Sequence, residues 1–96
     1  MGLTKPERDF VAIIHQKFGE LSKSGRWSKE FRLMEWGKNE PKFDIRNWDM
    51  GYTDNMHAGK GISLTLDEVK ELKRLLNEID LDTFEMPAKK IMPTIL

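Results

Sequence analysis

The 96-residue sequence contains no cysteine, only two histidines and no long apolar run. The lack of cysteine excludes a disulfide framework and a thiolate metal site, and is typical of a protein kept in a reducing compartment. No stretch approaches the ~20 apolar residues needed to span a bilayer, and the N-terminus MGLTKPERDF has no apolar signal-peptide core. We therefore expect a cytoplasmic protein with no membrane partner.

Motifs for enzymatic chemistry are also lacking. No serine or cysteine nucleophile motif is present, and GKG at residues 59–61 is too short to cradle a phosphate. His57 could join Asp49 and Asp54 in a loop metal site, but their spacing matches no ligand motif, and scattered loop residues are far more often solvated. We expect neither catalysis nor a bound metal or cofactor.

The sequence has no net charge, because 16 basic and 16 acidic residues cancel. Their distribution is uneven: the middle of the chain, residues 23–60, is mildly positive, and residues 65–85 are negative. Such a mixture is ordinary for a soluble surface and does not by itself indicate a nucleic-acid partner. A chain of this length forms one small domain with a modest core, so an additional buried interface such as a homodimer is expected.

Four segments with alternating polarity predict strands, and turns rich in glycine, asparagine and proline separate them. The predicted strands are a first segment ending near Ser22, residues 27–36, residues 41–49 and residues 60–65. The start of the chain is ambiguous, because residues 6–21 also fit a helical stripe with Thr4 as a candidate cap. Gly19 disfavours a helix interior by about 1 kcal/mol, so we expect a short helical or irregular start and then the strand.

The clearest predicted element is a helix that begins at Leu66. Thr65 and Glu68 form a capping box, in which each side chain satisfies a backbone N–H of the other residue. Apolar residues recur at helical spacing as far as Ile79. We expect an α+β fold in which this helix covers one face of a four-stranded antiparallel meander. Residues 81–96 contain two prolines and predict an extended tail that packs on its own sheet or on a partner.

The second and third predicted strands each have one apolar and one mixed face. Phe43 and Ile45 are expected to hold the sheet against the helix, together with Ile62 and Leu64. Tryptophans and basic residues gather on the opposite, open face. The alternation places on it Arg32, Met34, Trp36, Lys42, Asp44, Arg46, Trp48 and Ser63.

Basic side chains interleaved with tryptophan are typical of surfaces that bind single-stranded nucleic acid, since cations contact phosphates and aromatic rings stack on unpaired bases. The alternative interpretation is that these tryptophans are core or interface residues, which is the more frequent role of tryptophan in strands. Asp44 is expected to neutralise Arg46 or Arg32 as a cross-strand pair. Strict alternation puts Lys29 on the opposite face unless a bulge intervenes.

The run PKFDIRNW, followed by NMHAGKGISLTLDEVKEL, resembles the C-terminal DNA-binding domain of transcriptional positive cofactor 4, and most of all its short bacterial YdbC-type relatives. The resemblance implies a strongly curved four-stranded antiparallel sheet followed by a helix, in a symmetric homodimer whose strand surfaces make channels for single-stranded DNA. It divides the chain into an N-terminal extension, residues 1–13, the binding domain, residues 14–80, and a tail, residues 81–96.

The resemblance also implies contact residues. Trp36 matches the family's stacking aromatic, and Arg46 matches the arginine of its DIR segment. Lys60 matches the lysine of its KGI segment, while Lys38 and Lys42 lie in the region of its phosphate-contacting lysines.

Two further positions are matched less closely. Lys29 matches a basic position on the second strand, and Trp48 lies near a second aromatic but one place earlier relative to the arginine. With Arg32 from the strand pattern, the predicted nucleic-acid-binding residues are Lys29, Arg32, Trp36, Lys38, Lys42, Arg46, Trp48 and Lys60.

These patterns together predict a homodimer that binds single-stranded DNA, with RNA as a second candidate ligand. Sequence specificity is expected to be low, because stacking needs no sequence code, and the role is expected to lie in transcription or DNA maintenance. The alternative is a protein interaction or dimerisation module that uses the leucine-rich helix and the apolar tail.

Overall fold

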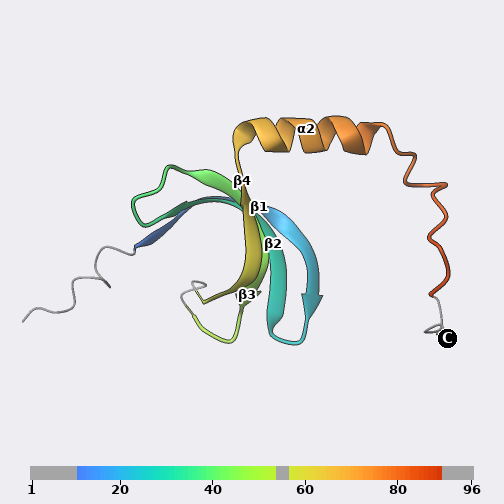
Figure 1. The fold of residues 1–96 in the computed structure, drawn as a ribbon. Coiled ribbons are helices and arrows are strands. Elements are labelled where there is room, and N and C mark those ends of the chain that lie inside the picture. The colour runs from blue at the N-terminus through green and yellow to red at the C-terminus, as the bar shows by residue number, and fades with distance from the viewer. Residues whose placement is uncertain (1–10, 54–56, 90–96) are drawn as a thin grey trace, which may run out of the picture.

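The computed structural model describes residues 11–53 and 57–89, which form an open antiparallel sheet followed by one helix (Figure 1). The elements are β1 (Ala12–Ser24), β2 (Trp27–Trp36), β3 (Lys42–Asp49), β4 (Ala58–Leu64) and α2 (Leu66–Asn77). Each strand pairs with the next along the chain, so the predicted α+β meander is confirmed. The proposed cap Thr4 and the loop residue Asp54 lie outside the described residues.

The predicted strands are confirmed, with shifts of a few residues at their ends. β1 begins at Ala12 and extends to Ser24, so the helical alternative is wrong for the described part of residues 6–21. β4 begins at Ala58 rather than Lys60. No helix in the described part of the chain is both long and apolar enough to span a membrane.

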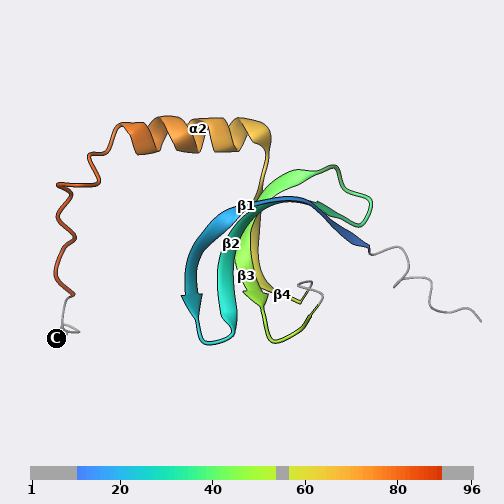
Figure 2. The same ribbon diagram turned by 180° about the vertical axis from the view of Figure 1, so that it is seen from behind.

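The sheet curls into an arch, seen in Figure 1 and from behind in Figure 2. Three register shifts interrupt the pairing of β1 with β2, between Ile14 and Gln16, between Lys17 and Gly19, and between Glu20 and Ser22. Each bulge inserts an extra residue that bends the strand and increases its twist. Repeated bulges along one strand therefore account for a sheet with distinct concave and convex faces.

The predicted alternation of β2 and β3 is confirmed, and their mixed faces form the concave side of the arch. Met34 and Trp48 are the buried apolar residues of the described chain. Polar residues of the same face are buried beside them, namely Ser28, Glu30, Arg32 and Asp44. The chain therefore buries its mixed aromatic and ionic face most completely.

The convex face is apolar and remains partly exposed. Phe18, Phe31 and Phe43 form a cluster in which the ring centroids lie 4.9 to 5.8 Å apart. Phe18 and Ile62 nevertheless expose 42% and 55% of their surfaces. Nothing within the described chain covers this side, which leaves apolar area available to another surface.

The helix has the predicted start but not the predicted position. The Thr65 hydroxyl accepts a hydrogen bond from the Glu68 N–H at 3.1 Å, and the Glu68 carboxylate accepts one from the Thr65 N–H at 2.8 Å, which confirms the capping box. However, α2 projects away from the sheet (Figures 1 and 2), and none of its residues is buried.

The prediction that the helix covers a sheet face is therefore wrong within a single chain. Only Thr65, in an extended conformation, separates the end of β4 from the start of α2, and the helix leaves the sheet at this point. The tail follows the helix away from the sheet, and its apolar residues Leu81, Phe84 and Met86 are exposed. The described part of the tail consequently does not pack on its own sheet.

Candidate nucleic-acid interface

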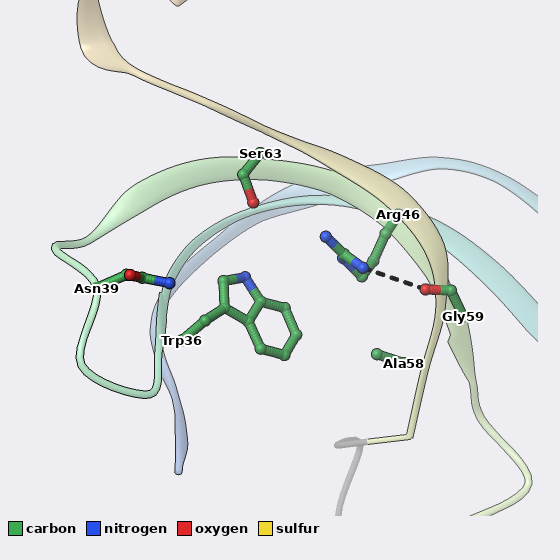
Figure 3. A pocket seen from close by; sticks show the side chains of 6 residues that line it. All are labelled: Trp36, Asn39, Arg46, Ala58, Gly59 and Ser63. Carbon is green, nitrogen blue, oxygen red and sulfur yellow. Dashed lines mark hydrogen bonds between the residues drawn. The ribbon is translucent and has the colours of Figure 1, made fainter. Parts of the chain in front are cut away.

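A hollow of about 460 Å³ opens on the concave face, beneath the arch (Figure 3). We call it the concave hollow, and its lining residues are Trp36, Asn39, Arg46, Ala58, Gly59 and Ser63. Trp36 ends β2, Arg46 lies in the middle of β3, and Ser63 lies on β4. Three neighbouring strands therefore contribute one polar or aromatic side chain each to a single space.

Asp44 fixes the two most distinctive of these side chains. Its fully buried carboxylate accepts hydrogen bonds from Arg46 Nε at 2.7 Å and Nη2 at 2.9 Å, and from Trp36 Nε1 at 3.2 Å. The Ser63 hydroxyl donates to it at 3.0 Å. Of the two predicted partners of Asp44, Arg46 is confirmed, but the pair lies along β3 and does not cross between strands. The same carboxylate also orients the indole of Trp36.

Arg46 is held from a second side by β4. Its Nη1 donates to the Gly59 carbonyl at 3.2 Å (Figure 3), and its guanidinium lies 4.8 Å from the centroid of the Trp36 ring. A Cβ at Gly61 would lie 1.9 Å from the Cβ of Arg46. Glycine in the KGI segment is therefore required for β4 to pass this close to Arg46.

The ring of Trp36 stacks on the ring of Trp48. The two rings are nearly parallel, with an interplanar angle of 9° and centroids 6.0 Å apart. The guanidinium of Arg32 lies 3.8 Å from the Trp48 centroid, within the range of a cation–π interaction. The result is a continuous series of Arg32, Trp48, Trp36 and Arg46, which we call the cation–aromatic ladder.

Glu30 fixes Arg32, the first residue of this ladder. Its carboxylate is 1% exposed and accepts hydrogen bonds from Arg32 at 2.6 and 2.9 Å and from Ser28 at 2.8 Å. Lys17 forms an ion pair with it at 3.1 Å. Burial, the largest single influence, raises the pKa of Glu30, but the hydrogen bonds from Arg32, Ser28 and Lys17 together hold that pKa below its ordinary value.

The structure separates the eight predicted contact residues by their surroundings. Trp36 and Arg46 line the concave hollow, whereas Arg32 and Trp48 are buried behind them. The remaining four are exposed lysines, of which Lys38 follows the end of β2, Lys42 begins β3, Lys60 lies on β4, and Lys29 lies on the convex face.

Other lining residues were not among the predicted contacts. Ser63 was placed on the open face by its alternation, but Asn39, Ala58 and Gly59 were missed. Asn39 lies in the turn after β2, where strand periodicity gives no signal. Gly59 belongs to the GKG segment, and a glycine within a strand is the sequence signal that could have indicated a close approach to neighbouring strands.

Residues 23–75 match the family described as transcriptional coactivator p15 (PC4). The chain belongs to the PC4 family. This match runs from the end of β1 into α2 and includes every predicted contact residue. A relative in Treponema pallidum (strain Nichols), described as an uncharacterized protein, is 38% identical over 77 residues, which are 79% of this chain and 87% of that protein.

The family resemblance predicted from PKFDIRNW and KGISL is therefore confirmed. The PC4 family is known for binding single-stranded DNA and for transcriptional coactivation. Membership gives the cation–aromatic ladder and the concave hollow a functional context, since they lie inside the matched region.

Proposed function

We propose that the protein binds single-stranded DNA in the concave hollow, with Trp36 as the stacking platform. The observation that carries this proposal is the state of Trp36: its ring is fixed by Asp44 and Trp48, yet it lines an open hollow. A platform held in advance loses little conformational freedom when a base binds. Each stacked base contributes about 1–3 kcal/mol.

Phosphate binding in this proposal is assigned to exposed cations around the hollow. Lys38, Lys42 and Lys60 lie on the segments that border it, and none of them forms an ion pair within residues 11–53 and 57–89. Arg46 differs, because the carboxylate of Asp44 already neutralises its charge. We therefore assign Arg46 to positioning the indole and contacting a base or sugar, and the lysines to neutralising phosphates.

Low sequence specificity follows from the same set of residues. Stacking and phosphate contacts do not distinguish bases, and the hydroxyl of Ser63 already donates to Asp44. Besides Arg46, this leaves the Asn39 amide as the side chain of the hollow that can read a base edge. RNA fits the same chemistry, and a role in transcription or DNA maintenance accords with the family.

We further propose that the protein functions as a homodimer built on α2. The stripe of Leu66, Leu72, Leu75, Leu76 and Ile79 is exposed in a single chain. An apolar stripe next to the partly exposed cluster of Phe18, Phe31 and Phe43 is unfavourable in water, so a second copy that covers the stripe and this cluster would stabilise the fold. Dimerisation in this form supplements nucleic-acid binding instead of replacing it.

The direct test compares oligo-dT with duplex DNA of equal length by fluorescence anisotropy across a salt series. We expect tighter binding of the single strand, because bases paired in a duplex are unavailable to Trp36. The logarithm of the association constant should fall with the logarithm of salt concentration at a slope of about −0.7 for each phosphate contacted. Equal affinity for duplex, or no salt dependence, would contradict the proposal.

A further inference from the structure

A second hollow, of about 290 Å³, lies on the other side of the β4 edge. We call it the edge hollow; it is lined by Trp27, Asn47, Gly59 and Lys60. Trp27 and Asn47 alternate with the concave residues Ser28 and Trp48, so they belong to the convex face. The edge hollow is therefore separate from the space that contains Trp36.

Trp27 is the most exposed tryptophan, with 39% of its surface accessible, whereas Trp48 is fully buried. Its ring lies against the backbone of β4: a Cβ at Gly59 would come within 2.8 Å of Trp27 Cζ3 and 3.3 Å of the Asn47 carbonyl oxygen. Glycine at position 59 thus leaves room for the indole beside the strand. An indole held in this way presents an aromatic surface to solvent.

The surroundings of Trp27 favour an anionic ligand. Lys60 lines the edge hollow and is exposed. Lys29, also exposed, lies on the same face as Trp27 and directly opposite Asn47 in the register. The carboxylate nearest in register, that of Asp49, is buried and paired with Arg26 at 2.8 Å, so it does not cancel these cations.

Gly59 lines both hollows, which makes them neighbours across one strand. β4 is an edge strand of the sheet, and no further strand follows it in the described chain. A ligand that occupies the concave hollow can therefore pass over Gly59 to the edge hollow without meeting another element of the sheet.

We propose that a single strand of nucleic acid bound at Trp36 continues over the β4 edge at Gly59 and stacks a second base on Trp27. In this arrangement Lys60 and Lys29 contact the phosphates on either side of that base. The inference rests on the proposed function, and it assigns a role to Lys29, which the alternation of β2 places away from the concave hollow.

The test uses the full chain and a length series of oligo-dT. Replacing Trp27→Leu should weaken binding of long oligonucleotides about 5- to 100-fold, which corresponds to the loss of one stacked base. The shortest oligonucleotides that bind should be unaffected, because they fill only the concave hollow. The matched control is Tyr52→Leu, which removes an exposed aromatic residue that lines neither hollow.

Photocrosslinking provides a readout that does not depend on a variant folding correctly. Wild-type protein is irradiated with oligonucleotides that carry 5-bromodeoxyuridine, and the crosslinked peptides are identified by mass spectrometry. We expect crosslinks at Trp36 with all lengths and at Trp27 only with the longer ones.

Equal loss for short and long oligonucleotides in Trp27→Leu would overturn the inference, as would unchanged affinity at every length without crosslinks at Trp27. Either result leaves the proposed function intact if Trp36→Ala weakens the binding of oligonucleotides of every length. Failure of the proposed function itself would appear differently, as wild-type affinity in the Trp36→Ala variant.

Discussion

Trp36 and Trp48 occupy opposite ends of the concave face and nevertheless stack, with ring centroids 6.0 Å apart. Trp36 is the last residue of β2, while Trp48 pairs with Ser28 at the beginning of that strand. Only a strongly bent sheet brings two such positions together. The geometry of the proposed binding site therefore depends on the curvature of the whole sheet.

The first prediction concerns Trp48. Replacing Trp48→Leu should lower the free energy of unfolding by about 2–4 kcal/mol, because the ring is fully buried between Trp36 and Arg32. Its Nε1 has no hydrogen-bond partner among the described residues, so the loss is one of packing. Urea denaturation measures the change, and a variant as stable as the wild type would show that the ladder does not support the fold.

Gly61 provides a prediction about backbone approach. Gly61→Ala should destabilise the protein by about 1–3 kcal/mol or more, since the added Cβ would lie 1.9 Å from the Cβ of Arg46 and 2.5 Å from the Ile45 carbonyl oxygen. The matched control is Gly19→Ala on β1, where an added Cβ has nothing within 4 Å. Thermal unfolding should separate the two variants, and equal melting temperatures would refute the predicted clash.

Glu30 predicts a specific dependence of stability on pH. Its pKa in the folded protein lies below its ordinary value, against burial that raises it, because Arg32, Ser28 and Lys17 donate to the carboxylate. The carboxylate therefore contributes stability above its unfolded pKa of about 4.3, and that contribution is lost as the pH falls through the folded pKa.

The Glu30→Gln variant isolates this contribution. At pH 7 it should be less stable than the wild type by about 3 kcal/mol, because the buried ion pair between Arg32 and the Glu30 carboxylate is lost. Acidification to pH 3.5 should reduce this difference in unfolding free energy, because protonation of Glu30 removes from the wild type the carboxylate that the variant already lacks. Unfolding free energies measured at both pH values test this, and a gap that stays constant would contradict it.

The helix stripe predicts the assembly state. Replacing Leu72→Lys and Leu76→Lys together should convert a dimer into a monomer, because two charges would be placed in the apolar stripe of α2. Sedimentation velocity measures the mass directly. Lys70→Glu, on an exposed position off the stripe, should leave the mass unchanged, and a monomeric wild type would disprove the dimer proposal.

Local patterns predicted most of the secondary structure. The alternation in WSKEFRLMEW and KFDIRNW placed each side chain on the correct face, because period two is a direct property of the extended chain. The capping box placed the helix start at Leu66 for a similarly local reason. The pairing of Asp44 with Arg46 followed from the same alternation.

Local sequence patterns could not predict contacts between residues far apart in the chain. The stacking of Trp36 on Trp48 depends on bulges in β1, and the alternation of β2 and β3 contains no sign of those bulges. The course of α2 away from the sheet is set by the backbone at Thr65, whereas amphipathicity shows only that the apolar stripe must meet some surface. The strand alternation consequently placed both tryptophans on the open face and did not show that Trp36 lines the hollow while Trp48 is buried.

The most direct test of the binding site compares Trp36→Ala with Trp36→Phe in anisotropy titrations with labelled oligo-dT. Trp36 is the aromatic side chain that lines the concave hollow, so we expect the alanine variant to lose about 10-fold or more in affinity and the phenylalanine variant to retain most of it. Both variants should remain folded by circular dichroism. Wild-type affinity in a folded Trp36→Ala variant would contradict a stacking site at Trp36.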